Sequence, residues 1–232
     1  MYTPGGRALI SPSLMCADQL ALGSEIDELA RLGADLLHLD IMDGHYVPNL
    51  TFGTDQCRAF AERAAMPLDI HLMVDDPDRW APVFAACGPS PYVTIHPETT
   101  WHPARTLAAI RDAGARPGLA IDPGQDPGSF RYLLGMVDLV LVMTVNPGYS
   151  GQTIVPWALD LIRQTRDLRS AGNCDFLIEV DGNVSWENIP AMIAAGADVL
   201  VAGTSSLFDP GIDRAEAARR LAVLASGASS SA

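Results

Sequence analysis

Short apolar segments alternate along this chain with longer segments in which apolar residues recur every three or four positions. The short segments are apolar nearly throughout, which is typical of strands in a parallel sheet covered by helices. We expect strands at Leu9–Ser13, Leu36–Asp40, Leu68–Met73, Tyr92–His96, Pro117–Ile121, Leu139–Thr144, Phe176–Asp181 and Val199–Ala202. The longer segments predict helices at Leu22–Leu32, Asp55–Ala64, Pro77–Cys87, Arg105–Ala113, Pro156–Ser170, Asn188–Ala195 and Arg214–Ala225.

This alternation of about eight strand–helix pairs within 232 residues is typical of an α/β protein with a single (β/α)8 TIM barrel. A doubly wound open sheet is the alternative, but no Gly-x-Gly-x-x-Gly motif follows the first expected strand. No linker or shift in composition divides the chain. We therefore expect one domain over residues 1–232, with a frayed, low-complexity tail at 226–232.

Polar side chains gather at the carboxyl ends of the expected strands. They are Ser11, Ser13, His38, Asp40, His71, His96, Glu98, Asp122, Thr144, Asn146, Glu179, Asp181, Thr204 and Ser205. The carboxyl ends of barrel strands meet on one face, and barrel enzymes build their active sites there. So many polar residues at one rim predict a functional site.

Four of these residues suit a metal ion. His38 and Asp40 are two residues apart on one strand, so their side chains point to the same side. His71 on the next strand can reach the same point, and Asp181 on the seventh could close the site from across the barrel. Either histidine alone would more often be an ordinary core residue. Together the four predict one divalent ion per subunit, with Zn²⁺ as the first expectation and Fe²⁺, Mn²⁺ or Co²⁺ as alternatives.

The loops after the sixth, seventh and eighth strands are rich in glycine, at Asn146–Gln152, Asp181–Asn183 and Ala202–Ser205. Glycine lets main-chain N–H groups approach a ligand closely, and a short helix starting at Thr204 would direct its positive end to the same place. A lone glycine pair usually marks an ordinary tight turn. Three such loops, at the position where barrels bind phosphate, favour a phosphate site.

The chain contains no lysine, which excludes several kinds of chemistry. It cannot form a Schiff base with a carbonyl substrate, and it has no side-chain ammonium to act as electrophile or proton donor. Activation of a carbonyl must therefore come from arginine, main-chain amides or a metal.

The formal net charge of −13 makes nucleic acid and an anionic membrane unsuitable partners. Residues Met1–Arg7 lack the apolar core of a signal peptide, and no apolar run approaches the ~18 residues that span a bilayer. The four cysteines form no Cys-x-x-Cys pair, as is typical of a reduced protein. We expect a cytoplasmic protein that binds a small molecule.

From Ile10 to about Phe208 the chain resembles the ribulose-phosphate 3-epimerase family. The matching stretches are Ser11-Pro12-Ser13-Leu14, His38–Asn49, His71-Leu72-Met73-Val74, His96-Pro97-Glu98, Val142–Gln152, Glu179-Val180-Asp181-Gly182 and Ala195–Ser205. The resemblance implies a barrel of the ribulose-phosphate-binding type that acts as a metal-dependent ketose-phosphate 3-epimerase. It also implies a homo-oligomer, either a dimer or a hexamer.

The resemblance assigns roles to individual residues. It implies that His38, Asp40, His71 and Asp181 hold the metal, and that Asp40 and Asp181 are also the acid/base pair. Ser13, His71 and Asp181 would contact the sugar, and Met42, Met73 and Met143 would pack over the reacting carbons. The residues expected around the phosphate are Gly148, Tyr149, Ser150, Gly151, Gly182, Asn183, Gly203 and Thr204.

The implied reaction makes chemical sense. A carbon next to a ketone is epimerised by removing its proton and returning one to the opposite face. A divalent cation stabilises the charge that develops on a cis-enediolate, and two carboxylates can exchange the roles of acid and base. Their titrations should therefore be coupled.

Two substrate pairs remain open. They are D-ribulose 5-phosphate with D-xylulose 5-phosphate, and D-allulose 6-phosphate with D-fructose 6-phosphate. Asn183 and Ser150 stand where the family usually has glycine, and Thr99 stands where it usually has alanine. The stretches Ser13–Cys16, His96–Thr99 and Gly203–Phe208 resemble the allulose-6-phosphate 3-epimerase branch.

Two other functions are alternatives. A phosphate-binding barrel lyase, such as an aldolase or decarboxylase, typically needs a lysine, and the chain has none. A non-catalytic barrel that only binds a sugar phosphate would not need the complete set of His38, Asp40, His71 and Asp181.

Overall fold

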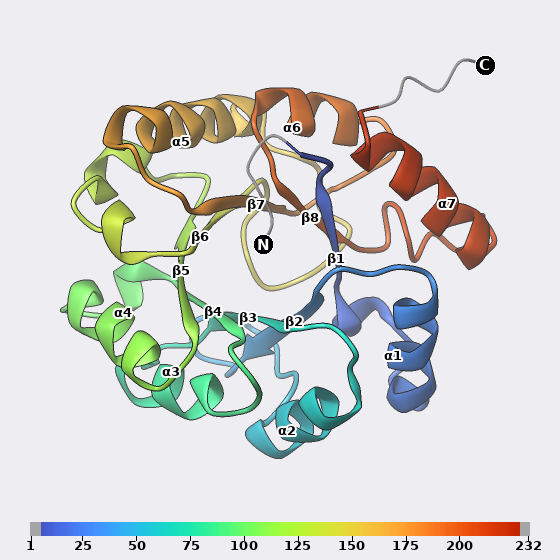
Figure 1. Ribbon diagram of the computed structural model, residues 1–232, viewed down its shortest axis with the longest axis horizontal. Coiled ribbons are helices and arrows are strands. Elements are labelled where there is room, and N and C mark those ends of the chain that lie inside the picture. Colours follow the sequence, from blue (N-terminus) through green and yellow to red (C-terminus); the bar gives the residue numbers. More distant parts are fainter. Residues whose placement is uncertain (1–5, 228–232) are drawn as a thin grey trace.

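The computed structural model describes residues 6–227, and its eight parallel strands form a barrel surrounded by helices (Figure 1). The strands are β1 (Leu9–Pro12), β2 (Leu37–Met42), β3 (Leu68–Met73), β4 (Tyr92–Ile95), β5 (Arg116–Ile121), β6 (Leu139–Met143), β7 (Leu177–Asp181) and β8 (Val199–Ala202). Neighbouring strands pair in the order β1-β8-β7-β6-β5-β4-β3-β2. All eight expected strands are present, and the predicted (β/α)8 TIM barrel is confirmed.

The barrel closes between β1 and β2. Ser13 and His38 form an isolated parallel bridge there. The main-chain N–H groups of Asp35 and Leu36 both donate to the carbonyl oxygen of Ile10, at 2.9 and 3.3 Å. This seam completes the ring, so the first and last strands of the pairing order are also neighbours.

Seven α-helices are described, and they lie outside the strands in a ring (Figure 1). They are α1 (Leu22–Arg31), α2 (Thr54–Arg63), α3 (Pro77–Ala85), α4 (Pro103–Asp112), α5 (Ala158–Gly172), α6 (Ile189–Ala195) and α7 (Arg214–Ala225). The β5–β6 connection instead contains two short 3-10 helices, at Pro127–Phe130 and Leu134–Met136. Pro127, Gly128 and Gly135 disfavour a longer helix in this segment. No helix between 6 and 227 is long and apolar enough to cross a membrane.

The predicted tail at 226–232 falls largely outside the described residues. Helix α7 ends at Ala225, and Ser226 is its C-cap with a right-handed backbone. Residues 228–232 lie beyond the part of the chain that the structure describes, so the expected fraying stays a prediction.

The core has two parts, because successive side chains on a strand point to opposite faces. The larger part lies between strands and helices and takes outward residues such as Leu39 and Ile70. A smaller apolar cluster fills one end of the barrel interior, with members that include Leu139, Leu177 and Val199. Above it, the interior is lined by buried polar residues, namely Ser11, His38, Asp40, Asp69, His71, Thr94 and Glu179. This polar layer is the foundation of the site.

Candidate metal centre and substrate cleft

The four predicted ligands come from three strands. On β2, Leu37, Leu39 and Ile41 pack under the helices, so the intervening His38 and Asp40 point into the barrel. His71 pairs with Asp40 in the β2–β3 register, and Asp181 is the last residue of β7. His38 and His71 are fully buried, and Asp40 is 4 % exposed.

The ring nitrogens that face this cluster lack partners. Nε2 of His38 and Nδ1 of His71 are buried and accept or donate no hydrogen bond within residues 6–227. Each lies 3.4 Å from Oδ1 of Asp40, and Oδ2 of Asp181 lies 3.9 Å from Nδ1 of His71. The four candidate ligand atoms all lie within 4.8 Å of one another. Ligands on a tetrahedral ion are about 3.4 Å apart when each bond is about 2.1 Å long. The cluster can therefore hold a divalent ion.

A buried carboxylate fixes the orientation of His38. Nδ1 of His38 lies 2.7 Å from Oδ2 of Asp69, which also accepts a hydrogen bond from Oγ of Ser11 at 2.8 Å. Burial disfavours ionisation of Asp69, but the charge of His38 outweighs it and lowers the pKa of Asp69. Burial disfavours the charged form of His38, but the carboxylates of Asp69 and Asp40 outweigh it and raise the pKa of His38 well above its usual range. A metal ion must therefore displace the proton on Nε2, and the lone pair on Nε2 then points at the candidate metal position while Nδ1–H donates to Asp69.

Glu179 lies in the same buried layer. Its Oε1 is 3.9 Å from Nδ1 of His38, and the residue has no exposed surface. Burial and the neighbouring charge of Asp69 raise the pKa of Glu179 well above its usual range. Of these two carboxyl groups, Asp69 is therefore the more readily ionised.

His71 is oriented by a second histidine. Its Nε2 lies 2.8 Å from Nε2 of His96, and the two rings are stacked. Nδ1 of His96 in turn lies 2.9 Å from the hydroxyl of Tyr46, 3.2 Å from Asp122 and 3.3 Å from Glu98. Burial and repulsion from His96 lower the pKa of His71 to about 4, although contact with Asp40 opposes this. His71 is therefore neutral at pH 7, as a metal ligand must be.

The two aspartates of the cluster titrate very differently. Burial works against ionisation of Asp40, but the charge of His38 and the close approach of both histidines hold the pKa of Asp40 well below its usual range. Burial, followed by repulsion from Asp40, raises the pKa of Asp181 to about 7. Near neutral pH the pair thus holds one carboxylate and one carboxyl group, which suits one base and one acid.

An open cleft of about 590 Å³ lies above the cluster. Of the predicted site residues, Ser13, Asp40, Met42, Met73, Met143, Gly148, Tyr149, Ser150, Gly151, Asp181, Gly182, Asn183, Gly203 and Thr204 all line it. His38 and His71 do not, because they are buried beneath Asp40. Oγ of Ser13 donates to Oδ2 of Asp40 at 2.6 Å, so Ser13 orients the aspartate from the cleft side.

The loops after β6 and β7 need glycine at two positions. Gly182 has a φ of +105°, and a Cβ there would lie 2.4 Å from a methyl carbon of Val145. Gly148 has a φ of +120°, and its Cβ would lie 3.1 Å from Cβ of Val47. A side chain at either position would force the loops apart.

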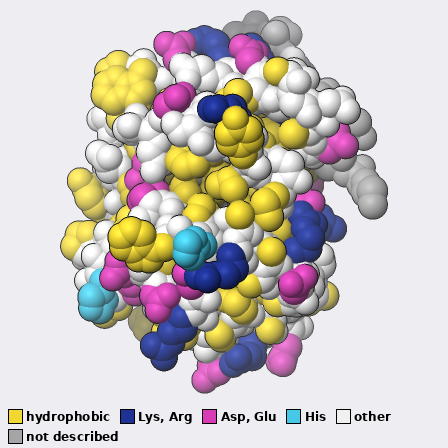
Figure 2. Space-filling model, turned by 90° about the vertical axis from the view of Figure 1, so that its left-hand side faces the viewer, with side chains coloured by type: hydrophobic (Ala, Val, Ile, Leu, Met, Phe, Trp, Pro, Cys, Tyr) yellow, Lys and Arg dark blue, Asp and Glu magenta, His cyan; other side chains and the backbone are white. Residues whose placement is uncertain are grey.

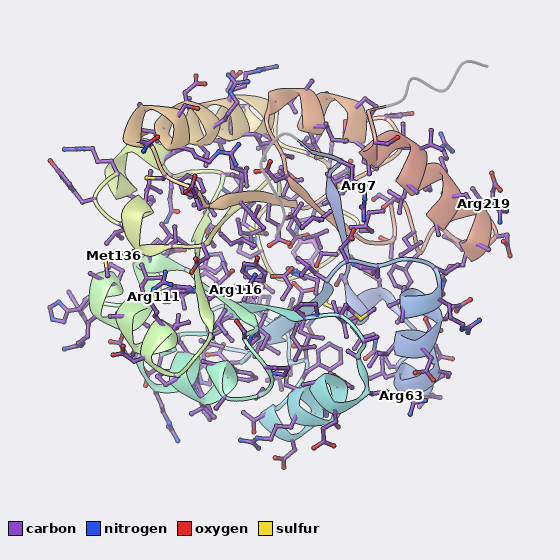
Figure 3. All side chains as sticks on the ribbon, in the orientation of Figure 1. Arg7, Arg63, Arg111, Arg116, Met136 and Arg219 are labelled. Atoms are coloured by element: carbon purple, nitrogen blue, oxygen red, sulfur yellow. The ribbon has the colours of Figure 1, made fainter. Side chains whose placement is uncertain are left out.

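Main-chain donors in the β7 and β8 loops suit an anion. Within residues 6–227, the N–H groups of Asn183, Val184, Gly203 and Ser205 have no hydrogen-bond acceptor. No arginine lines the cleft. The arginines labelled in Figure 3 (Arg7, Arg63, Arg111, Arg116 and Arg219) lie on the outer helices or next to the amino ends of β1 and β5. An anion here would be held by uncharged groups.

The expected short helix at Thr204 is absent. Residues 204–208 form a hydrogen-bonded turn, in which the N–H groups of Ser206 and Phe208 both donate to the carbonyl oxygen of Gly203 at 3.1 Å. The prediction was wrong because both bonds close on a single carbonyl, so no helical ladder develops. The donors at this position are individual N–H groups and not a helix end.

Sequence reasoning missed several residues that complete the site. Asp69 lies one layer below the strand ends and was not singled out, and Met15 and Cys16 line the cleft beside the expected methionines. Glu179 was expected at the rim, but it lies in the same buried layer as Asp69. Asp69 could have been found, because it precedes His71 by two positions and so shares its face of β3. The His71–His96 contact was not anticipated.

Fold and site together define a class: a parallel α/β barrel with a buried His/Asp cluster, able to hold a divalent ion, at the carboxyl ends of its strands. A mutant tryptophan synthase alpha-subunit from Pyrococcus furiosus shares the fold. It superposes with a TM-score of 0.65 at 16 % sequence identity, covering 97 % of this chain and 98 % of that chain.

Comparisons by sequence are more specific. Ribulose-phosphate 3-epimerase 1 of Cupriavidus necator is 42 % identical over 208 residues, covering 88 % of this chain and 86 % of the relative. Ribulose-phosphate 3-epimerase of Escherichia coli is 42 % identical over 202 residues, covering 87 % and 89 %. Residues 9–208 match the ribulose-phosphate 3 epimerase family. The chain belongs to this family, as its motifs predicted, and its class among enzymes is that of the epimerases.

Proposed function

We propose that this protein is a metal-dependent ketose-phosphate 3-epimerase that inverts C3 of its substrate. The observation that carries the proposal is the pair of unpartnered ring nitrogens, on His38 and His71, that face Asp40 beside Asp181. His38, Asp40, His71 and Asp181 would hold one divalent ion per subunit. Zn²⁺ is the first candidate for a four-ligand set of nitrogen and oxygen atoms, ahead of Fe²⁺, Mn²⁺ and Co²⁺.

Bound there, a divalent cation would polarise the C2 ketone and make the neighbouring C3–H more acidic. The ionised carboxylate, Asp40, would take the C3 proton. The electron pair of the C3–H bond would form the C2–C3 double bond while the π pair of the C2 ketone moves onto its oxygen, which gives a cis-enediolate. The carboxyl group of Asp181 would return a proton to the opposite face of C3. In the reverse direction the two aspartates exchange roles.

The rest of the cleft would bind and shield the substrate. Main-chain N–H groups of the β7 and β8 loops would hold the phosphate, and Ser13, which lines the cleft, would contact the sugar. His71, which was also expected to contact the sugar, is buried beneath Asp40 and would act as a metal ligand. The thioethers of Met42, Met73 and Met143 are buried, and they would exclude water from the enediolate without offering a competing proton. The relatives named ribulose-phosphate 3-epimerase favour the pentulose pair as substrates, with D-allulose 6-phosphate and D-fructose 6-phosphate as the alternative.

The proposal is tested by assaying both substrate pairs in D₂O on protein whose metal content has been measured. We expect turnover with deuterium incorporated at C3, and loss of both when the metal is removed by a chelator. Asp40→Asn and Asp181→Asn should each lower kcat by about 10²–10⁴-fold. Near-normal turnover in either variant, or binding of sugar phosphates without any exchange, would contradict the proposal.

A further inference from the structure

A chain of side-chain amides links the β7 loop to the β6 loop at the edge of the cleft. Nδ2 of Asn183 donates to the carbonyl oxygen of Gln152 at 2.7 Å. Nδ2 of Asn188, at the start of α6, donates to Oδ1 of Asn183 at 2.8 Å and to its carbonyl oxygen at 3.1 Å. Nδ2 and Oδ1 of Asn183 are thus both hydrogen-bonded to other residues of the protein.

Gln152 closes the β6 loop on itself. Its Nε2 donates to the carbonyl oxygen of Asn146 at 2.6 Å and to that of Tyr149 at 3.0 Å. The last residue of the loop is therefore bonded to its first residue and to its middle. Because Asn183 is bonded to the main chain of this same residue, it holds the closed loop against β7.

The backbone of Asn183 is suited to this contact. Its φ is +45°, in the left-handed region where asparagine is one of the few tolerated side chains besides glycine. In that conformation the side chain reaches across to the neighbouring loop. Its main-chain N–H has no acceptor within residues 6–227, so the backbone of Asn183 could still donate to an anion.

We propose that Asn183 is a positioning residue whose side chain latches the β6 loop (residues 146–152) and sets the width of the anion end of the cleft. This deepens the proposed function and rests on it, because the anion is the substrate phosphate. No cation lines the cleft, so phosphate affinity depends on donors from separate loops. If those loops are held in place before binding, less ordering entropy is lost when the phosphate enters.

The test compares two asparagines that share a left-handed backbone. Asn183→Gly removes the amide but keeps a φ that glycine adopts freely. Asn173→Gly is the matched control, since Asn173 has a φ of +49° and lies exposed at the end of α5, next to the start of β7. Asn188→Ala is a third variant, because Asn188 contacts Asn183 but does not line the cleft.

Hydrogen exchange of the Val155 main-chain amide, which donates to the carbonyl oxygen of Thr144 at 2.9 Å across the base of the β6 loop, is the primary measurement, made on the full chain without substrate. Loss of one hydrogen bond should speed this exchange about five- to tenfold in Asn183→Gly. Asn188→Ala should change it in the same direction by less, and Asn173→Gly should leave it unchanged. With ketose phosphate, KM should rise about fivefold or more in Asn183→Gly, by a larger factor than kcat falls.

Combining Asn183→Gly with Gln152→Ala shows whether the Asn183 side chain acts by holding the β6 loop or by binding the phosphate directly. That variant removes the bonds that close the loop but leaves the Gln152 carbonyl for Asn183 to bind. A latch predicts that the two changes in KM are not additive, because both act through the same loop. Additive changes in KM, or a raised KM with unchanged hydrogen exchange, would overturn the proposal. If exchange responds as expected but the wild type turns over no ketose phosphate, the latch stands and the proposed function fails.

Discussion

The residue that decides whether His38 can bind a metal is Asp69, which lies beneath it in the barrel. A neutral imidazole has one N–H and one lone pair, and the hydrogen bond at Nδ1 determines which nitrogen is free for a metal. The carboxylate of Asp69 accepts a hydrogen bond from Nδ1–H of His38, and it is held in place by a second hydrogen bond, from Oγ of Ser11. The candidate ligand set is therefore four residues that would contact the ion, with at least one buried carboxylate behind them.

Replacing Asp69 by asparagine should weaken metal binding about 10–100-fold, because the amide can donate to His38 as well as accept and no longer enforces one tautomer. The measurement is competition of the metal-free protein against a chelator of known affinity. Asp35→Asn is the control, since Asp35 accepts from Arg7 and from the Ile10 amide, close to the amino end of β1. Equal affinities in Asp69→Asn and the wild type would contradict this role.

Metal affinity should also depend on pH through Asp181. Its pKa is raised to about 7, so below that pH a cation must displace a proton before it can bind this carboxyl group. Affinity should therefore fall as the pH is lowered from 8 to 6, by about tenfold per pH unit and per proton displaced once the pH is below 7. Chelator competition at several pH values gives this slope. Asp181→Asn should bind metal more weakly and show a shallower slope, and an unchanged slope would argue against Asp181 as a ligand.

At the residue scale, the sequence showed which side chains stand at the strand ends but not what lies behind them. His38, Asp40 and His71 could be predicted because strand alternation and barrel geometry bring them to one rim. Asp69 was missed, and Glu179 was expected at the rim, because attention to the strand ends ignored the layer below them. The pKa difference between Asp40 and Asp181 could not be predicted, since it depends on burial and on separations that the sequence does not contain.

At the scale of elements, strands and loops contribute different parts of the site. The candidate metal ligands lie within or at the end of β2, β3 and β7, whereas the candidate anion donors lie in the loops that follow β7 and β8. Strand bounds could be predicted to within a few residues from uninterrupted apolar runs. The expected helix at Thr204 and the amide links between loops could not, because turn geometry depends on contacts between segments distant in sequence.

Helix α5 is fixed to the strands by a buried ion pair. Arg169 donates to Asp198, a buried residue that also accepts from the Ile178 amide at 2.9 Å. Arg169→Met should lower the free energy of unfolding by about 3–5 kcal/mol, because it removes the Arg169 cation from a buried carboxylate. Urea unfolding measures this. Arg163→Met on the same helix is the control, since the exposed Arg163–Asp160 pair should contribute no more than about 1 kcal/mol. Similar losses in the two variants would refute the distinction.

At the scale of the whole molecule, the formal net charge of −13 opposes the entry of an anionic substrate. Figure 2 shows acidic and basic side chains intermixed on one side of the molecule, so the charge is not confined to a single patch there. The cleft contains no basic side chain to offset this field. The proposed phosphate would therefore have to be bound through short-range hydrogen bonds, against a repulsive long-range field.

Salt should consequently raise kcat/KM for a ketose phosphate, in contrast to enzymes whose field attracts the substrate. Raising the ionic strength from about 0.01 to 0.15 M shortens the Debye length from about 30 to 8 Å and screens the repulsion. Steady-state kinetics over this range test the prediction, with potassium chloride and potassium gluconate compared to separate screening from competition by chloride. A fall in kcat/KM with both salts would show that the field attracts the substrate.

The origin of the candidate metal ligands in strands, and of the anion donors in loops, bears on how such a protein can diversify. Sequence changes after β6, β7 or β8 can reshape substrate preference while the inner wall, and with it the capacity for proton transfer, is inherited intact. Replacements within β2 or β3 have no such freedom, because each position there serves folding and chemistry at once. Members of this family should therefore differ more readily in substrate preference than in the mechanism of proton transfer.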